Sequence, residues 1–244
     1  MKAVILAAGV ASRLRPLTDN TPKCLLNIGG KTILERTVSN ILDNGINDFI
    51  IVTGFLKEKI ENHLLEKFPE LNVKYIFNDV FDSTNNIYSL WLTKDFMIGD
   101  EMLLLDSDIL FNKQILKLLL ESPHNNCLAV KSGLQLSEEE IKVTVSGDGS
   151  IKEISKVVDP ADAVGESIGI EKFGAELTKE LFKILDYMIL KENKKNIFYE
   201  AAFEKAINDG AKIFPVDVGK LKCIELDTVE DVKFAQEKVI DGLD

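Results

Sequence analysis

Short apolar runs alternate with longer helical patterns through the first half of this 244-residue chain. The apolar runs fall at Val4–Leu6, Phe49–Val52, Val73–Phe77 and Met102–Leu105. Strands that alternate with helices in this way form a mostly parallel sheet that is covered by helices on both faces. The alternation therefore predicts an α/β fold. In sheets of this kind, ligands bind beyond the carboxyl ends of the strands.

The segments between these runs have the residue spacing of helices. In Lys31–Asn44, apolar residues recur on one helical face, and Asn44 and Gly45 then supply a stop signal. Leu56–Lys67 and Asn86–Lys94 show similar patterns. We expect a helix at each of these three segments.

The second half mixes strand and helix signals. Lys142–Val145 and Ser150–Ile154 flank Gly147-Asp148-Gly149, which predicts a hairpin. No linker or repeat divides the chain, so we expect one domain over residues 1–244 that contains a substrate-binding insertion. The remaining predictions are strands at Ser167–Phe173, Ala211–Val216 and Cys223–Leu226, and helices at Ala175–Leu190, Tyr199–Asn208 and Thr228–Ile240.

The charge balance argues against nucleic acid as a partner. The formal net charge is −11 and the sequence pI is about 4.8, whereas a general phosphate-backbone binder needs a basic surface. No apolar stretch approaches the roughly 20 residues of a membrane span. The three cysteines are too far apart for a zinc knuckle or a disulfide framework. We expect a cytoplasmic protein with free thiols.

The N-terminal segment Met1–Leu26 carries the strongest chemical signal. Its apolar strand ends in the small residues Ala7-Ala8-Gly9, which let backbone N–H groups approach a phosphate closely. Arg13, Arg15 and Lys23 follow at short spacing. A glycine turn after a strand is common, and each cation alone could be a surface residue, but together they predict a phosphate clamp.

Two acidic segments could hold a metal ion. Asp106 and Asp108 end the run LLLDSDILF and alternate along an extended chain, so their side chains point the same way. Carboxylates at a strand's end suit Mg²⁺, which takes oxygen ligands, although aspartate is also common in turns. Asp227, in IELDTVED, follows another strand, and either Asp227 or Thr228 could cap the last helix.

The pattern AAG-x-x-x-R-L-x-P-L-T-x-x-x-P-K over residues 7–23 resembles the signature of the nucleoside-triphosphate transferase family. The resemblance implies a Rossmann-like α/β/α sandwich with a mostly parallel, mixed sheet, of the nucleotide-diphospho-sugar transferase type. It also implies Mg²⁺ as the cofactor. One departure is Ala11, where the family usually has glycine. The implied roles are nucleotide binding by Leu6, Ala7, Ala8, Gly9, Arg13, Lys23 and Asp106, catalysis by Lys23 and Arg13, and metal binding by Asp108 and Asp227.

The segment FDSTNNIYSLWL, residues 81–92, indicates the subgroup. It lacks the P-x-G-x-A stretch of many sugar nucleotidyltransferases and is similar to choline-phosphate and aminoethylphosphonate cytidylyltransferases of bacteria. CTP is then the expected nucleotide, with Asn85, Asn86 and Ser89 near its base or ribose. Asparagine amides offer both donors and acceptors to a pyrimidine. Either asparagine could instead cap the following helix.

The acceptor site is predicted from four residues. Lys156 aligns with a lysine that related enzymes direct at the acceptor phosphate. Carboxylates and aromatic faces would suit a cationic amine, and Glu166, Tyr199 and Glu200 supply them, with Trp91 as a further candidate. Tyr199 also fits a core-facing helical stripe.

Together these residues predict a Mg²⁺-dependent cytidylyltransferase that moves CMP from CTP to phosphocholine, 2-aminoethylphosphonate or a similar acceptor. We also expect the protein to be a monomer or homodimer. Its expected role is in the decoration of cell-surface polysaccharide or lipid. Residues 1–130 would bind the nucleotide and residues 131–227 the acceptor. The alternatives are a sugar-1-phosphate nucleotidyltransferase using UTP, dTTP or CTP, a glycosyltransferase using the DxD triplet at residues 106–108, and a non-catalytic nucleotide sensor.

Overall fold

The computed structural model describes residues 1–133 and 135–243. Within them, nine strands form one mixed sheet in the order β10-β9-β11-β6-β1-β4-β5, with β8 beside β11 and β12 beside β8. The four strands β6, β1, β4 and β5 are parallel, and β11 is antiparallel to β6. The strands are β1 (Lys2–Ala7), β4 (Asp48–Thr53), β5 (Asn72–Phe77), β6 (Met102–Asp106), β8 (Cys127–Lys131), β9 (Lys142–Val145), β10 (Ile151–Ser155), β11 (Gly165–Phe173) and β12 (Phe214–Asp217).

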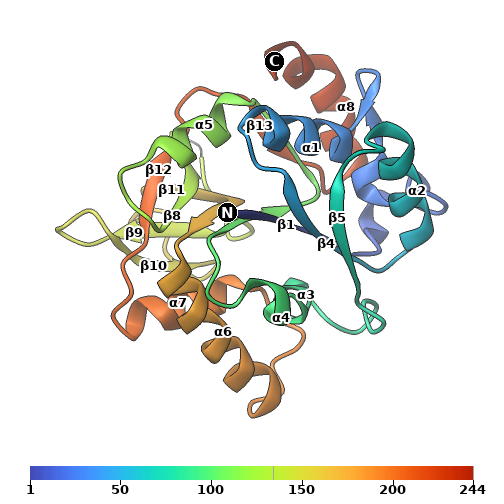
Figure 1. Cartoon of the computed structure of the whole chain (residues 1–244). Coiled ribbons are helices and arrows are strands. Elements are labelled where there is room, and N and C mark those ends of the chain that lie inside the picture. Colours follow the sequence, from blue (N-terminus) through green and yellow to red (C-terminus); the bar gives the residue numbers. More distant parts are fainter. Residues whose placement is uncertain (134, 244) are drawn as a thin grey trace.

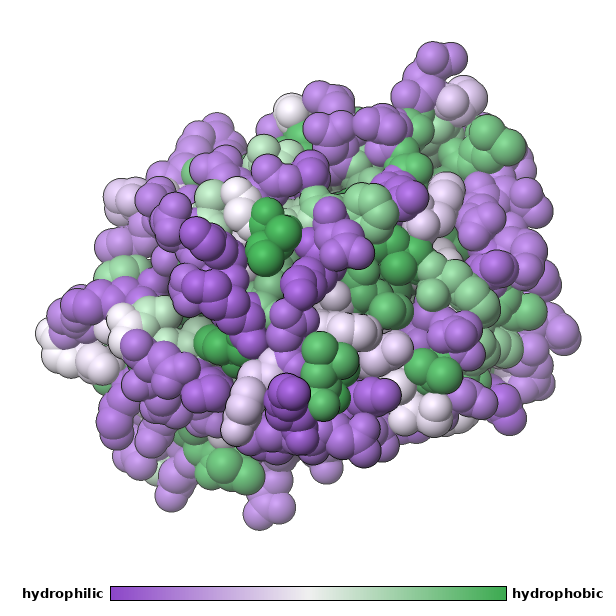
Figure 2. Space-filling model, turned by 60° about the horizontal axis from the view of Figure 1, so that its bottom comes forward, coloured by the Kyte–Doolittle hydropathy of each residue, from purple (hydrophilic) through white to green (hydrophobic). Residues whose placement is uncertain are grey.

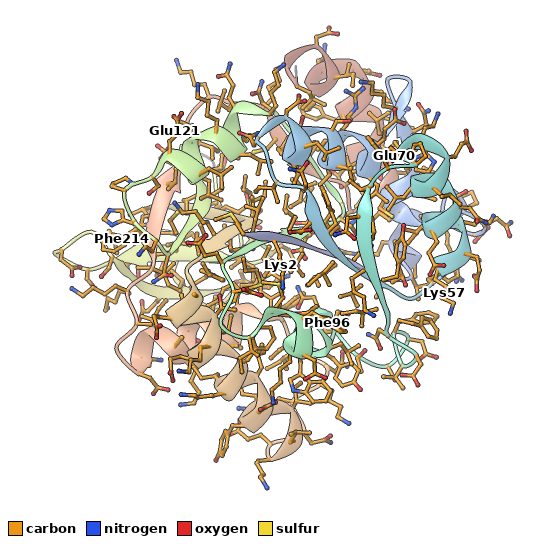
Figure 3. All side chains as sticks on the ribbon, viewed as in Figure 1. Lys2, Lys57, Glu70, Phe96, Glu121 and Phe214 are labelled. Atoms are coloured by element: carbon orange, nitrogen blue, oxygen red, sulfur yellow. The ribbon has the colours of Figure 1, made fainter. Side chains whose placement is uncertain are left out.

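Helices cover both faces of this sheet, as the alternation of strands and helices predicts (Figure 1). Alternate residues of β1 enter different cores: Ile5 packs with one helical layer and Val4 with the other. The side chains fill the space between the sheet and these layers (Figure 3). One layer contains α1 (Ile33–Asp43), α2 (Lys57–Lys67) and α5 (Gln114–Glu121), and the other contains α3 (Asn86–Leu92), α4 (Lys94–Met97), α6 (Ala175–Leu190) and α7 (Glu200–Asn208).

A smaller unit, formed by β7 (Ile109–Phe111) with β13 (Cys223–Glu225) and α8 (Val229–Phe234), packs beside the sheet. β7 pairs with β13 in an antiparallel ribbon, and α8 follows it. Thr228 caps α8 through a reciprocal pair of hydrogen bonds with Asp231, so the predicted helix start is confirmed. The helix is regular only to Phe234, after which a wider π-helical turn covers residues 235–239.

Two other predicted helices differ from the structure at their ends. Lys31 and Thr32 form β3, which pairs with β2 (Asn27–Ile28), so α1 begins at Ile33 with Thr32 as its cap. The predicted helix at residues 86–94 is divided at Thr93, whose side chain donates to the carbonyl of Leu90. The sequence patterns did not predict β7, α5 or β8.

The outer surface on the α3, α4, α6 and α7 side is mostly hydrophilic, with apolar areas between the charged side chains (Figure 2). Among the described residues, no helix is both long and apolar enough to cross a membrane.

Candidate active site

A cavity of about 740 Å³ lies at the carboxyl ends of β1, β5 and β6. The loop after β1, the first turn of α3, the start of β11 and the segment after β13 complete its wall. This is the position at which a parallel sheet is expected to bind ligands. The sequence-predicted residues that line it are Leu6, Ala7, Ala8, Gly9, Arg13, Lys23, Asn85, Asn86, Ser89, Asp106, Asp108, Lys156, Glu166, Glu200 and Asp227.

The loop after β1 is held in an unusual backbone conformation at Ala11. Its φ is +51° and its ψ is +50°, in the left-handed region, which costs a residue with a Cβ roughly 1 kcal/mol. The Thr18 hydroxyl donates to the carbonyl of Ala11 at 2.9 Å and fixes the turn. The left-handed backbone explains why glycine is the usual residue here. The loop nevertheless keeps Arg13 at the cavity wall.

Lys23 is the central cation of the site. Its Nζ donates to Oδ2 of Asp108 and to Oδ1 of Asp227, each at 2.8 Å. Burial alone would lower the pKa of Lys23, but the two carboxylates outweigh it and hold the pKa above its ordinary value. Arg13 reaches the other oxygen of Asp227 at 2.7 Å. Burial opposes these cations, yet Lys23 and Arg13 keep the pKa of Asp227 below its ordinary range.

Three carboxylates gather around this lysine. Oxygen atoms of Asp108, Glu225 and Asp227 lie within 4.8 Å of one another. The ribbon of β7 and β13 brings them together, because the Leu226 N–H donates to the carbonyl of Asp108 at 3.1 Å. Burial and the neighbouring Asp108 raise the pKa of Glu225 to about 8. Glu225 was not among the predicted site residues, although it alternates with Asp227 as Asp106 does with Asp108.

This donor set fits Mg²⁺. All three groups are hard oxygen donors, which is the ligand type that Mg²⁺ prefers. Oδ1 of Asp108 is buried and has no hydrogen-bond partner within the described residues, so it is available to a cation. Carboxylates this close repel one another unless a positive charge lies between them.

Comparison with known proteins decides the class. The model of the nucleotidyl transferase family matches residues 2–140, more than half of the chain. The chain belongs to this family. The choline-phosphate cytidylyltransferase of Streptococcus pneumoniae is 28% identical over 243 residues, covering 97% of each chain. The phosphoglutamine cytidylyltransferase of Campylobacter jejuni is 27% identical over 261 residues, covering 98% of this chain and all of the relative.

A solved structure supports the same class. The CTP:phosphocholine cytidylyltransferase of Streptococcus pneumoniae superposes with a TM-score of 0.79 at 26% identity, covering 97% of both chains. The Rossmann-like sandwich and the family resemblance read from residues 7–23 are therefore confirmed. This chain is an enzyme of the nucleotidyl transferase family.

The two predicted asparagines line the cavity of this nucleotidyl transferase at the start of α3. Oδ1 of Asn85 accepts from the Asn86 N–H at 2.7 Å, so Asn85 caps α3. Oδ1 of Asn86 accepts from the backbone N–H of Tyr199 at 2.9 Å. Asn78, which the sequence did not single out, is buried and donates to the Ser89 hydroxyl at 3.2 Å. These bonds fix the polar groups that face the cavity here.

Tyr199 lies beneath the cavity and not in its wall, which corrects its predicted contact with the acceptor. Its side chain is fully buried and packs against Phe203, so the core-facing alternative is the one the structure adopts. The phenol donates to Oδ2 of Asp106 at 2.9 Å. Trp91 also lies outside the wall of the cavity. Its indole N–H points to α6, where it donates to Asp186.

Glu171 is a buried acid beside Tyr199 that the sequence did not reveal. It is fully buried on β11, and neither carboxylate oxygen has a hydrogen-bond partner among the described residues. Burial and the neighbouring Asp106 raise its pKa well above the ordinary value. Burial, followed by the charge of Asp108, likewise raises the pKa of Asp106. Two acids with raised pKa values therefore lie in this region, Asp106 in the cavity wall and Glu171 buried behind it.

The remaining wall is acidic and carries one lysine. Lys156 pairs with Glu139 at 3.5 Å and lies 5.1 Å from the centre of the Phe198 ring. Burial raises the pKa of Glu166, and Glu140 adds to the shift. Burial also raises the pKa of Glu200 to about 7. Glu139 and Glu140 line this end as well, and the sequence did not single them out.

Proposed function

We propose that this enzyme transfers CMP from CTP to a small phosphorylated or phosphonate acceptor that carries an amine, as phosphocholine and 2-aminoethylphosphonate do. The observation that carries the proposal is the position of Lys23, whose Nζ lies between two carboxylates at one end of the cavity. Two relatives that span nearly the whole chain are named cytidylyltransferases, which supports CTP as the nucleotide.

The phosphate end of the cavity would bind the triphosphate. The small residues Ala7–Gly9 leave room for phosphates against the backbone, and Arg13 and Lys23 supply positive charge. Lys23 would donate to the α-phosphate and offset the charge that grows there during transfer. Asp106 would line the nucleotide site with its carboxylate oriented by Tyr199.

Asp108 and Asp227 would hold Mg²⁺, and Glu225 is close enough to join them. The ion supplies neutralisation of phosphate charge in nucleotidyl transfer. Before substrate binds, the positive charge of Lys23 offsets the repulsion between the carboxylates of Asp108 and Asp227.

The reaction needs no protein nucleophile. An oxygen of the acceptor phosphate or phosphonate attacks the α-phosphorus of CTP, a new P–O bond forms, and the bond to the β-phosphate oxygen breaks. Pyrophosphate leaves with the electron pair of that bond. The protein's contribution is positioning and charge stabilisation, as in other phosphoryl transfers.

The acidic end of the cavity would select the acceptor. Lys156 lies at this end and would pair with the acceptor phosphate. Glu166 and Glu200 would face the amine, because a cation relieves the repulsion among buried carboxylates. Residues 1–130 would then act as the nucleotide half and residues 131–227 as the acceptor half of one domain over residues 1–244. We place this activity in the cytoplasm, in a monomer or homodimer that binds no nucleic acid and serves cell-surface decoration.

The test is pyrophosphate release in the presence of Mg²⁺. CTP, UTP, dTTP, ATP and GTP would each be combined with phosphocholine, 2-aminoethylphosphonate and glucose 1-phosphate. Turnover with CTP and an amine-bearing acceptor is the expected result. Turnover with glucose 1-phosphate alone would overturn the proposed acceptor class, and turnover with UTP or dTTP alone would overturn the proposed nucleotide.

A further inference from the structure

The part of the cavity wall that the start of α3 supplies has the character of a base-binding site. Phe81, Asn86 and Ser89 line the wall here and carry no charge, whereas the cations Arg13 and Lys23 pair with the carboxylates that follow β6 and β13. A nucleobase is uncharged and planar, so it fits this part of the wall while its phosphates reach Arg13 and Lys23. This step rests on the proposed use of CTP.

Each acceptor atom of this wall already accepts one hydrogen bond from within the protein. Oδ1 of Asn86 accepts from the Tyr199 N–H at 2.9 Å, and Oδ1 of Asn85 accepts from the Asn86 N–H at 2.7 Å. The Ser89 hydroxyl oxygen accepts from Nδ2 of Asn78 at 3.2 Å. Each of these oxygen atoms therefore already has one of its two lone pairs bonded to a donor of the protein.

The donors on the same groups remain free. Over residues 1–133 and 135–243, no hydrogen bond uses Nδ2 of Asn85, Nδ2 of Asn86 or the hydroxyl proton of Ser89. The amide of Asn86 cannot rotate to exchange its two ends, because the Tyr199 N–H would then face an NH₂ group. A buried N–H left without an acceptor is costly, so this orientation is enforced.

A wall of donors distinguishes cytosine from uracil. Cytosine presents two adjacent acceptors, O2 and N3, whereas uracil carries a hydrogen on N3 and would oppose donor to donor. We propose that Asn86 is a specificity-determining residue that selects cytosine by directing its Nδ2 at N3 of the base. Tyr199 acts through Asn86 by holding the amide oxygen with its backbone N–H.

The inference can be tested on the unmodified enzyme by changing one atom of the nucleotide. In 3-deaza-CTP a C–H replaces N3, while O2 and the exocyclic amine remain. We expect its kcat/KM to fall roughly tenfold or more below that of CTP, the size of one lost discriminating hydrogen bond. Equal kcat/KM for the two nucleotides would overturn the role of Asn86 and leave the proposed cytidylyl transfer intact.

A substitution gives the complementary test. In Asn86→Asp, one carboxylate oxygen keeps the bond to Tyr199 and the other presents an acceptor to the base. The ratio of kcat/KM for CTP over that for UTP should fall by about tenfold or more. Ser83→Asp is the charge control, because Ser83 is exposed on the same loop outside the cavity wall, and its ratio should stay unchanged.

The two proposals fail in different ways. If the unmodified enzyme releases no pyrophosphate with CTP and any acceptor, cytidylyl transfer is wrong. If it uses CTP but the Asn86→Asp variant keeps the ratio of the unmodified enzyme, only the inference is wrong. Where that variant is inactive, the ratio of Kd values for CTP and UTP, measured by calorimetry, replaces the kinetic ratio and decides in the same way.

Discussion

Nζ of Lys23 and Oδ1 of Asp227 lie 2.8 Å apart although 204 residues separate them in the chain. The contact joins the loop after the first strand to the segment after the last one. Pairing of β7 with β13 makes it possible, since that ribbon carries Asp227 to the same edge as Asp108. The phosphate end of the cavity is therefore built from both ends of the chain.

Replacing Lys23 by alanine should reduce kcat by about 10²–10³-fold, the usual cost of removing a group that stabilises charge in the transition state. The same change leaves Asp108, Glu225 and Asp227 without their central cation. We therefore expect a lower Tm without metal and a larger rise in Tm on adding Mg²⁺ than in the unmodified protein. Turnover and thermal unfolding with and without Mg²⁺ provide the measurement.

The control for this change is Lys152→Ala, because Lys152 is an exposed lysine outside the cavity wall. It should retain normal turnover and the normal response of Tm to Mg²⁺. Near-normal kcat in Lys23→Ala would remove Lys23 from the proposed transfer step.

Asp108→Asn and Asp227→Asn should each raise the Mg²⁺ concentration needed for half-maximal activity by roughly tenfold or more, since even residues outside the ligand set change metal affinity by that amount. Glu225→Gln should raise it too if Glu225 joins the site. Chelation should abolish activity, and Mg²⁺ should restore it. Asp217→Asn, in an aspartate that binds Ser132 away from the cavity, is the control. An unchanged Mg²⁺ titration in the Asp108 or Asp227 variant would rule out its role as a ligand.

Glu200 should make stability depend on pH. Burial raises its pKa from 4.5 to about 7, so the folded protein binds this proton more tightly than the unfolded chain does. The stabilisation is complete below about pH 4.5 and is lost as pH rises through about 7. The Glu200→Gln substitution should remove this loss of folding free energy, which is on the order of 3 kcal/mol at pH 8. Its Tm should exceed that of the unmodified protein by several degrees at pH 8 and by little at pH 5; equal differences at both pH values would contradict this account.

Tyr199→Phe should lower the free energy of unfolding by about 1–3 kcal/mol, because the buried carboxylate of Asp106 loses its phenol donor. The backbone N–H of residue 199 is unchanged, so the preference for CTP over UTP should persist. Urea unfolding and the ratio of kcat/KM for the two nucleotides measure the two effects separately. Unfolding at the same urea concentration as the unmodified protein would show that this hydrogen bond contributes little.

Much of the nucleotide half could be predicted because its signals are local. The apolar run before Gly9 predicts β1, and the cations that follow within a few residues lie on the same wall of the cavity. Asp108 and Asp227 were named from their strand-end positions and the family resemblance, and the structure places both on one lysine.

The residues that sequence patterns missed depend on tertiary packing. Glu171 lies between Ile170 and Lys172 in β11, and nothing local distinguishes a buried acid from a solvent-facing one. Tyr199 fits both a core stripe and a ligand contact by sequence, and only its packing against Phe203 separates the two. β8 (Cys127–Lys131) was missed, and the strands that hold it in the sheet, β11 and β12, come much later in the chain.

The bond from the Tyr199 N–H to Asn86 is made by the main chain, and this has an evolutionary consequence. A point mutation at position 199 changes the side chain but leaves the N–H in place, unless it introduces proline or moves α7. If random variants are selected for the use of a different pyrimidine nucleotide, we therefore expect many changes at position 86 and few at position 199. Base preference depends on the main-chain N–H of Tyr199, and the bond to Asp106 depends on its phenol. The two properties can therefore evolve separately although both involve Tyr199.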